Sequence, residues 1–336
     1  MLYREDLEKR EMALLSEKAV KSCESKGRET YEEPCPFRTE FQRDRDRIIH
    51  SKAFRRLMHK TQVFLSPEGD HYRTRLTHTL EVMQVARTIA RSLNLNEDLT
   101  EAIAMGHDLG HTPFGHNGEM VLNRLYPGGF QHNEQSLRVA EVLESTPNRR
   151  GMNLTFEVRD GIRNHTGSLP AATLEGQIVK ISDRIAYINH DIDDAVRSGV
   201  ITVNDLPKSA LELFGYGHRE RIDCMVSNVV AFSDGKDFVR MDDEHAEQLN
   251  ILRNFMFANV YKSDKVKKEE DLLKVEVVIS SLYDYFIKYP EKVPEELQML
   301  MDKDGVDTIV KDYVAGMTDR FAINLYSDLF VPKGWK

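Results

Sequence analysis

The chain has 336 residues, of which 40 % are hydrophobic, so it can bury a core as one large domain or two ordinary ones. Its 46 lysines and arginines against 55 aspartates and glutamates give a formal net charge of −9, which disfavours extended contact with nucleic acid and with anionic membranes. Cys23, Cys35 and Cys224 are odd in number and form no C-x-x-C pair, which argues against a disulfide framework and a zinc ribbon.

Residues 1–37 are expected to form an N-terminal helix and a loop. The stretch 1–22 is charged throughout and lacks the apolar segment of a secretion signal. No run along the chain approaches the roughly 20 apolar residues that cross a membrane. Together with the cysteine usage, this predicts a cytoplasmic protein that does not associate with membranes.

Residues 37–60 are net positive within this acidic chain, and two interpretations of them stay open. The segment could cradle a triphosphate or a regulatory nucleotide at a subunit boundary, because guanidinium groups suit phosphate oxygens. Alternatively it is a helix laced with salt bridges, since Asp44 and Asp46 alternate with its cations. The cations are Arg38, Arg43, Arg45, Arg47, Lys52, Arg55, Arg56 and Lys60.

Helical periodicity dominates the next part of the chain. The stretch 77–93 places apolar residues on one stripe, and 173–199 repeats isoleucine at intervals of three and four. Strand-like alternation is confined to two weak candidates, 152–156 and 228–239. Glycine and proline clusters mark loops between the helices. We therefore predict an all-α fold.

The composition of the sequence changes after Gly199. Up to that point it is rich in histidine, and beyond it helical segments alternate with turns rich in proline, glycine and lysine. We expect residues 201–336 to form a helical C-terminal region that completes the fold or the oligomer interface. Residues 38–200 then form the core that carries the chemistry.

Residues 107–116, HDLGHTPFGH, place three histidines and an aspartate in one short segment. Buried histidine is costly, so such a cluster needs a metal, an anion or a mutual hydrogen-bond network. With one histidine and one aspartate from two other helices, it gives a mixed nitrogen and oxygen set that suits a borderline or hard divalent ion. The four residues are His78, His107, Asp108 and Asp183.

Neighbouring residues on an ideal helix diverge by about 100°, so His107 and Asp108 can hold one ion only if their helix terminates there. We assign that termination to Gly110, because glycine commonly follows the end of a helix.

The order H…HD…D, with the segments HDLGHTPFGH, FQHNEQSLR and SDRIAYINHDIDDA, resembles the HD-superfamily phosphohydrolases and, within them, the deoxyguanosine triphosphate triphosphohydrolase family. The resemblance covers roughly residues 38–200. It implies an HD-domain core in which His78, His107, Asp108 and Asp183 hold the metal. It also implies that water attacks the α-phosphorus of a dNTP and releases a deoxynucleoside and intact inorganic triphosphate. Manganese or magnesium is the expected ion, and iron, cobalt, nickel or zinc would also suit.

The resemblance further implies which residues act on the leaving group. His116 matches the catalytic histidine, which would give a proton to the leaving 5′-oxygen. Glu119 follows three residues later on the same helix, where its carboxylate can orient the imidazole and raise its pKa. His111 would stabilise the anion near the phosphate and would not be a metal ligand.

Substrate contacts follow from the same resemblance. Arg75 matches a phosphate-binding arginine, and its guanidinium suits phosphate oxygens. Gln62 matches a glutamine that reads the sugar 3′-hydroxyl, and His132 matches another active-site histidine. Tyr187 would crowd C2′ and disfavour a ribose hydroxyl, while Asp191 would accept from the 3′-hydroxyl. The enzyme would then prefer dNTPs to NTPs.

Two alternatives remain beside a dNTP triphosphohydrolase. Another HD-superfamily phosphohydrolase, a phosphomonoesterase or a phosphodiesterase, would use the same metal set on a different substrate. A non-catalytic nucleotide sensor or single-stranded nucleic-acid binder would keep the pocket without turnover, but the intact metal set and the net charge of −9 count against it. The expected partners are a dNTP substrate, a regulatory dNTP and further copies of the chain in a homo-oligomer.

Overall fold

The computed structural model describes residues 1–62, 73–261 and 269–332. Within these ranges the chain forms seventeen α-helices, short 3₁₀ and π turns and a few isolated β-bridges, and no strand. The predicted all-α fold is confirmed.

Both weak strand candidates are wrong. Residues 152–156 contribute only Thr155, which forms an isolated bridge with Arg28. Residues 228–239 begin inside α11 (His218–Ser233), whose buried positions recur at four-residue spacing. The helical period of the apolar residues therefore outweighs the β-propensity of the valines in this segment.

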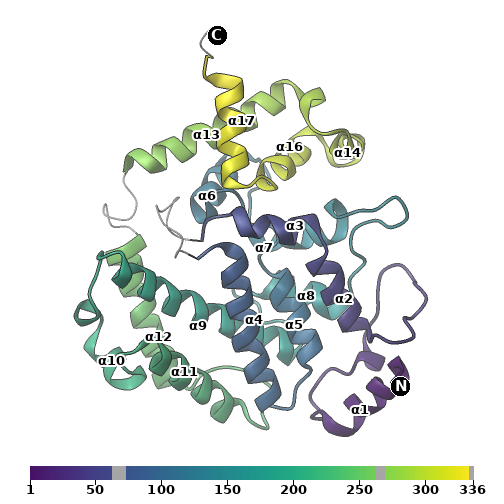
Figure 1. The fold of residues 1–336 in the computed structure, drawn as a ribbon, viewed down its shortest axis with the longest axis vertical. Helices are drawn as coiled ribbons and strands as arrows, with labels where there is room; N and C mark the ends of the chain where they lie inside the picture. Colours follow the sequence, from purple (N-terminus) through teal and green to yellow (C-terminus); the bar gives the residue numbers. More distant parts are fainter. Residues whose placement is uncertain (63–72, 262–268, 333–336) are drawn as a thin grey trace.

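Five helices form the centre of the molecule (Figure 1). α4 (Arg75–Ser92) packs against α5 (Glu97–Gly106) and α9 (Leu174–Arg197), while α2 (Glu40–Ile49) and α8 (Phe156–Asn164) pack on α5. The histidine-rich loops leave this centre where α5 and α8 end.

The two long helices begin where their sequences place an N-cap. The side chain of Thr74 accepts from the N–H of Thr77 at the start of α4, and the side chain of Thr173 accepts from the N–H of Gly176 at the start of α9. Ile178, which starts the isoleucine stripe of α9, is fully buried in the central core. The predicted helical segments 77–93 and 173–199 thus form as expected.

The other helices surround this centre and build the C-terminal part. In chain order they are α1 (Arg4–Leu14), α3 (Lys52–Arg56), α6 (Gly115–Leu125), α7 (His132–Arg138), α10 (Lys208–Phe214), α11, α12 (Asp243–Met256), α13 (Glu269–Lys288), α14 (Glu295–Gln298), α15 (Met301–Asp304), α16 (Val306–Ala315) and α17 (Asp319–Phe330).

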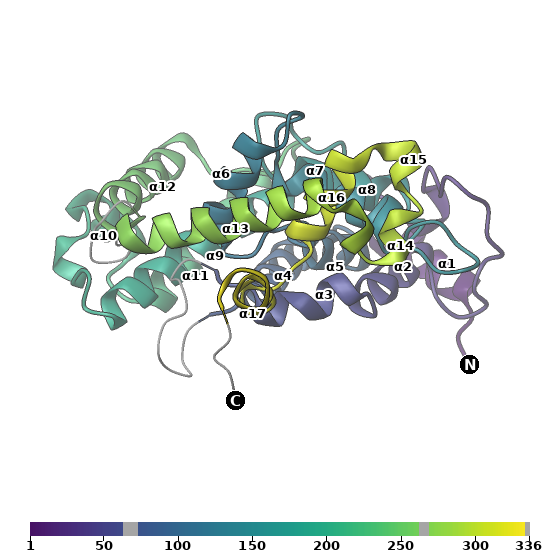
Figure 2. The same ribbon diagram turned by 90° about the horizontal axis from the view of Figure 1, so that it is seen from above.

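Apolar side chains gather in two separate clusters. The first runs from the N-terminal segment through the central helices and includes α10 to α12. The second is formed by α6, α13, α16 and α17, with Phe114 and Phe130 from the loops beside α6. Figures 1 and 2 show α13 lying along α6 at the C-terminal end of the molecule. The boundary expected at residue 200 stays a prediction, but α10 to α12 share the core of the histidine-rich part.

The arginine-rich segment 37–60 is held by ion pairs. Arg43 and Arg47 both pair with Glu32, and Arg45 contacts Asp46, Asp98 and Glu101. These contacts fix α2 against the N-terminal loop and α5. They favour the salt-bridged helix over the phosphate cradle.

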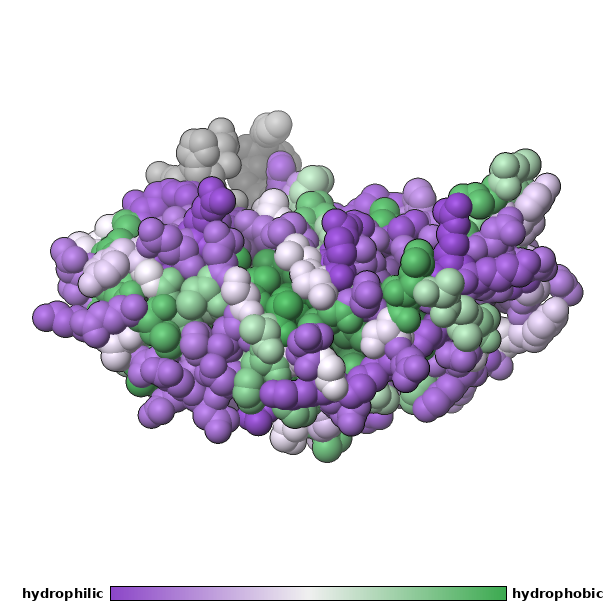
Figure 3. Space-filling model, turned by 90° about the horizontal axis from the view of Figure 1, so that it is seen from below, coloured by the Kyte–Doolittle hydropathy of each residue, from purple (hydrophilic) through white to green (hydrophobic). Residues whose placement is uncertain are grey.

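The end of the molecule opposite the C-terminal helices is covered mostly by hydrophilic residues, with hydrophobic ones between them near its middle (Figure 3). Among the helices that the structure describes, none is both long enough and apolar enough to cross a membrane.

Glu175, in the first turn of α9, is a fully buried carboxylate. Its Oε1 accepts from the backbone N–H groups of Val20, at 3.1 Å, and Asn96, at 3.0 Å. The residue therefore ties the N-terminal segment and the start of α5 to α9. Burial raises the pKa of Glu175 to about 7.

We predict that Glu175→Gln removes a pH dependence of the free energy of unfolding. The carboxyl has a pKa of about 7 in the folded protein and about 4.3 in an unfolded chain, so the folded state binds this proton more tightly. Its contribution to stability is present below about pH 4 and is lost as the pH rises to about 7, by on the order of 3 kcal/mol. Urea unfolding from pH 5 to pH 8 measures this loss in the wild type and its absence in the variant.

The control is Glu244→Gln, which changes an exposed carboxylate on α12. If the wild type and Glu175→Gln lose stability equally over this range, Glu175 does not carry the raised pKa.

Candidate metal centre and active site

His107 and Asp108 follow α5 directly, because the helix ends at Gly106 and His107 is its C-cap. The expectation that Gly110 ends the helix is wrong, since the helix stops four residues earlier. Gly110 instead allows α7 to approach, because a Cβ there would lie 2.2 Å from the backbone nitrogen of Ser136. The Ser136 hydroxyl holds this turn by donating to the His107 carbonyl at 2.7 Å and accepting from the Gly110 N–H at 2.8 Å.

The structure brings all four predicted metal ligands together. Nε2 of His78 on α4 lies 3.0 Å from Oδ1 of Asp183 on α9. Nε2 of His107 lies 3.9 Å from that same oxygen and 3.5 Å from Oδ1 of Asp108. Ligand atoms of His78, His107 and Asp108 all lie within 4.8 Å of one another. Only the Asp183 side chain is appreciably exposed, at 21 %, so the group opens toward α9.

The donor atoms of this group fit a divalent ion. Nδ1 of His107 donates to the Ala104 carbonyl at 2.6 Å, which leaves the lone pair on Nε2. That buried Nε2 and the buried Nδ1 of His78 have no hydrogen-bond partner in the described part of the chain. Histidines that bind metals usually donate their other ring N–H to a carbonyl or a carboxylate, as His107 does.

Arg75 and His111 surround Asp108. The guanidinium of Arg75 donates from Nη1 to Asp108 Oδ2 at 2.9 Å, and also donates to the carbonyls of Thr61, at 3.3 Å, and Gln62, at 3.4 Å. It has N–H donors beyond these three, so a phosphate could still bind it. Nε2 of His111 lies 3.2 Å from Asp108 Oδ1. Asp108 is therefore oriented from both sides.

The start of α6 is set by an uncommon backbone conformation. Phe114 is in the left-handed region with φ +62°, which costs a non-glycine residue free energy unless the surroundings fix it. Here its ring is buried in the second apolar cluster. Gly118, one turn into α6, has no room for a Cβ, which would lie 2.0 Å from the Pro113 carbonyl oxygen. The loop and the first turn of α6 thus pack as one unit.

Glu119 holds two histidines at the start of α6 and α7. Nδ1 of His116 lies 3.0 Å from Oε2 of Glu119, and Nδ1 of His132 lies 3.0 Å from Oε1. The backbone N–H of His132 also donates to Oε1, at 2.8 Å. Both rings therefore point their Nε2 atoms away from the carboxylate. Burial opposes ionisation of Glu119, but the two imidazoles outweigh it and lower its pKa.

Glu119 raises the pKa of His116, as predicted, but the net pKa of the imidazole is lowered. Desolvation and the charges of Arg75 and His132 lower the pKa by more than Glu119 raises it. A bound polyphosphate would raise the pKa again, since a nearby anion favours the imidazolium.

A row of histidines lies beside the four candidate metal ligands. The rings of His111 and His132 stack with centroids 4.1 Å apart, and Nε2 of His132 lies 3.2 Å from Nε2 of His165. His165 follows α8 and is buried, and desolvation with the charges of its neighbours lowers its pKa to about 3. Its ring is therefore neutral at physiological pH.

The first residue of α17 holds two loops of the site. Oδ1 of Asp319 accepts from the Phe114 N–H at 2.9 Å, and Oδ2 accepts from the N–H of Thr61 at 3.0 Å and from the Thr61 hydroxyl. The carboxylate thus fixes both the loop that leads into α6 and the segment that precedes Gln62.

Lys60 makes a second link between the same parts. It is 3 % exposed and donates to the carbonyls of His111 and Ala315, the latter at 3.0 Å. Burial lowers its pKa to about 7. The C-terminal helices are therefore part of the structure that positions the histidine loop.

Tyr187 and Asp191 lie one and two turns beyond Asp183 on α9, as predicted. Asp191 is buried and accepts from the hydroxyl of Tyr261, which follows α12. Burial raises its pKa to about 7. Tyr187 is partly buried beside Arg253 of α12. The described side chains around these two residues thus come partly from beyond residue 200.

Gln62 is the last residue described before the gap at 63–72. Its carbonyl accepts from Arg75, while its buried side-chain Oε1 has no partner among the described residues. Contact of this side chain with a sugar stays a prediction.

Sequence reasoning missed three residues that the structure places at the site, His165, Tyr261 and Asp319. It named Lys60 only as one of the cations of the segment 37–60. His165 had a usable signal, because it follows a helix and precedes a glycine and proline loop, much as His107 ends α5. Asp319 had only the helix-start pattern of Thr318 before it. Nothing local distinguished Tyr261 or the contacts that Lys60 makes, since both depend on partners far along the chain.

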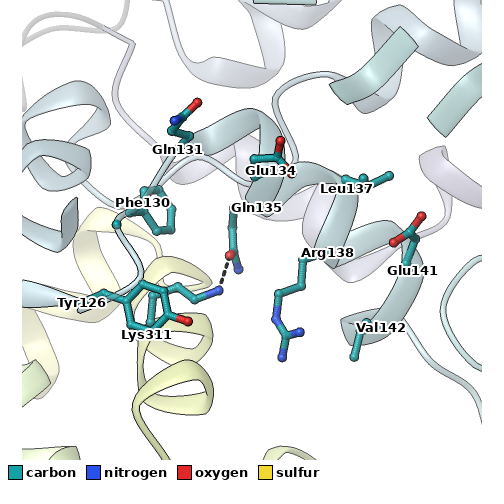
Figure 4. A pocket seen from close by; sticks show the side chains of 11 residues that line it. Tyr126, Phe130, Gln131, Glu134, Gln135, Leu137, Arg138, Glu141, Val142 and Lys311 are labelled. Carbon is teal, nitrogen blue, oxygen red and sulfur yellow. Dashed lines mark hydrogen bonds between the residues drawn. The ribbon is translucent and has the colours of Figure 1, made fainter. Parts of the chain in front are cut away.

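A separate cavity of about 310 Å³ lies between α7 and α16 (Figure 4). Lys311 at its wall donates to Gln135 at 2.6 Å and to Asp312 at 2.5 Å. Arg138 donates to Asp312 at 2.6 Å and to Asp304 at 2.7 Å. Because these cations already pair with carboxylates, we interpret the cavity as part of the junction between the two helices.

Comparison with known proteins gives two matching family models. The HD domain matches residues 75–188 and the phosphohydrolase-associated domain matches residues 239–328. The first covers every predicted metal ligand and the second covers Asp319.

Three relatives match the chain over almost its whole length, and each bears the name deoxyguanosinetriphosphate triphosphohydrolase-like protein. The protein of Caldanaerobacter subterraneus subsp. tengcongensis is 57 % identical and covers 100 % of this chain and 98 % of its own. That of Desulfatibacillum aliphaticivorans is 48 % identical, with 99 % of both chains covered. That of Clostridium perfringens strain 13 is 48 % identical, also with 99 % of both covered.

We predict that Asp183→Ala weakens manganese binding. The substitution removes one carboxylate of the proposed ligand set, and losing a ligand lowers affinity by at least the ten- to hundredfold seen for residues that only support a ligand. Calorimetric titration of the purified chain with Mn²⁺ measures the change. Asp193→Ala on the same helix is the control. Unchanged affinity in Asp183→Ala would remove this residue from the ligand set.

A second prediction concerns the link from α17. Asp319→Ala leaves the backbone N–H groups of Phe114 and Thr61 without their acceptor, at a cost of about 1–3 kcal/mol for each buried group left unpaired. Thermal unfolding of Asp319→Ala should therefore occur several degrees below the wild type. Asp302→Ala on α15, an exposed carboxylate, is the comparison. Equal melting temperatures for all three proteins would contradict the role given to Asp319.

Proposed function

The chain belongs to the deoxyguanosinetriphosphate triphosphohydrolase-like family of HD-domain phosphohydrolases, and from that premise we propose that it is a metal-dependent dNTP triphosphohydrolase. The reaction cleaves the bond between the α-phosphorus and the 5′-oxygen and yields a deoxynucleoside and inorganic triphosphate. The observation that carries the proposal is the group of candidate metal ligands from α4, the end of α5 and α9. His116 lies beside it, and the half-buried carboxylate of Glu119 holds Nδ1 of that histidine.

His78, His107, Asp108 and Asp183 are the residues that would hold the ion. A divalent ion supplies Lewis-acid polarisation of a phosphoryl oxygen and makes water a better nucleophile at neutral pH. Arg75 and His111 keep Asp108 in place for this role through contacts of 2.9 Å and 3.2 Å. Manganese or magnesium suits two imidazoles and two carboxylates.

His116 is proposed as the general acid. Its Nδ1 is fixed by Glu119, so Nε2 is free to give its proton to the leaving 5′-oxygen. The ring is the exposed member of the cluster, with 63 % of its side chain open, as a group that must reach substrate requires. Glu119 stabilises the imidazolium before transfer, because it accepts the other ring N–H.

Cationic and neutral hydrogen-bond donors near the candidate metal ligands suit a polyphosphate. Arg75, His111 and His132 lie around Asp108 and Glu119, and they form a local anion site in a chain whose net charge is −9. The triphosphate would therefore lie between α4 and the start of α6. The sugar would then lie toward α9.

Tyr187 and Asp191 are proposed to contact the deoxyribose, with Gln62 opposite them. The carboxylate of Asp191 already accepts from the Tyr261 hydroxyl. It would accept the 3′-hydroxyl either with its other oxygen or in place of Tyr261. The partly buried ring of Tyr187 would exclude a 2′-hydroxyl by its bulk. The base, a regulatory dNTP and assembly into a homo-oligomer stay predictions.

The test is to incubate the purified chain with Mn²⁺ and each dNTP, singly and mixed, and to separate the products by ion-exchange chromatography. We expect deoxynucleoside and triphosphate in equal amounts. His116→Ala should lower kcat on the order of 10²- to 10⁴-fold, because it removes the proton donor, while metal binding stays unchanged.

His50→Ala, at an exposed histidine after α2, is the matched control and should keep full activity. Pyrophosphate with a nucleoside monophosphate as products would show that a different bond is cleaved, the one between the α- and β-phosphates, and would contradict the proposal. Tight dNTP binding with no product in any mixture would favour a sensor.

A further inference from the structure

A larger cavity, of about 660 Å³, lies beside the loop that carries His107 and Asp108. α3 and the α7 segment form one side of it, and α14, α16 and α17 form the other (Figure 1). Leu109 and Gly110 of the loop are part of its wall. Cavities of this volume are of the size that holds a small organic ligand. An occupant would therefore contact the turn that follows two of the candidate metal ligands.

Much of the cavity wall is apolar. Val139 and Leu143 belong to the π-helical turn that continues α7, and Leu297 comes from α14. The aromatic side chains of Tyr313 and Phe321 also line the cavity, and Phe321 is 46 % exposed. Such walls favour a ligand with an apolar body, because its surface is then removed from water.

Arg56, the last residue of α3, supplies a cation that a ligand could use. Its guanidinium lies over Gly316, where a Cβ would lie 3.3 Å from Nη1 of the arginine. Within the described part of the chain, Arg56 forms no ion pair or side-chain hydrogen bond. In the smaller cavity between α7 and α16, by contrast, Lys311 and Arg138 both pair with Asp312. The donors of Arg56 thus stay available, and their fork suits a carboxylate.

The other charged groups of the wall are paired or exposed. Lys60 donates to two backbone carbonyls, and Lys52 lies 3.4 Å from Glu296. Glu144 accepts from the first two backbone N–H groups of α3. Glu295 and Glu296 are exposed. One available guanidinium among these carboxylates suits a ligand with a single negative charge, whereas like charges would repel a triphosphate.

We propose that this cavity binds a monocarboxylic acid with an apolar body. The carboxylate lies on the guanidinium of Arg56, and the body lies against Tyr313 and Phe321. Hydrogen bonds between a guanidinium and a carboxylate are charge-assisted, and two of them can form in parallel. The apolar walls cover the rest of the ligand. The cavity is distinct from the proposed active site, so this ligand site does not depend on dNTP hydrolysis.

The test is calorimetric titration of the full chain, without metal or nucleotide, with naphthoate as the aromatic probe and octanoate as the aliphatic probe. We expect at least one of these acids to bind at one site per chain. Arg56→Ala should weaken this binding roughly tenfold to a hundredfold, because it removes hydrogen bonds between charged groups. Phe321→Ala should weaken it as well, since it removes apolar surface from the wall.

Two matched controls lie beside these residues but outside the cavity wall. Arg55→Ala changes the neighbouring arginine of α3, and Ile323→Ala changes an exposed apolar residue of α17. Both should bind the acid as the wild type does. All four positions are exposed, so the variants should keep the helical circular dichroism of the wild type.

No binding of either acid at millimolar concentration, or equal affinity in the wild type and Arg56→Ala, would overturn the site. Binding of dGTP that competes with the acid and is weakened by Arg56→Ala would show that the cavity takes a nucleotide, and would overturn the assigned ligand. Because the readout is binding and not turnover, a chain that binds the acid but hydrolyses no dNTP would contradict the proposed function alone.

Discussion

The loop between α5 and α6 is the constraint on which the rest of the site depends. It must leave a buried helix at His107, turn sharply beside α7 and enter α6 through a left-handed Phe114. No regular secondary structure can satisfy its backbone along this path, so side chains do so. Asp319 accepts from the Phe114 N–H and Lys60 donates to the His111 carbonyl, which makes the C-terminal helices a part of the active-site framework.

The free-energy cost of placing these histidines together is reduced because each has a defined partner for one ring nitrogen. His107 and His165 use backbone carbonyls, while His116 and His132 share Glu119. This fixes the tautomers and aims the remaining nitrogens at a common space. Burial makes each unpaired nitrogen costly, and cations in that space would relieve the cost. The same arrangement would therefore stabilise the fold when a cation is bound and would serve the proposed reaction.

Much of this could be predicted from residues near one another in sequence. The period of the apolar residues gave the helices 77–93 and 173–199, and the spacing of His107, Asp108, His116 and Glu119 placed four side chains at two helix ends. The Glu119 and His116 contact followed from a three-residue separation on one helix. The net pKa of His116 could not follow, because it also depends on Arg75 and His132 from other helices.

The sequence by itself determined the helical class, the types of the candidate metal ligands and the local pairings within a turn or two, because each depends on a short stretch and its periodicity. The tertiary structure alone decided that His165 faces His132, that Tyr261 caps Asp191, and that Asp319 and Lys60 hold a loop about 200 and 50 residues away along the chain. These contacts arise where helices cross. Which side chains meet there is set by the packing of whole faces and by buried charge, and no local pattern encodes either.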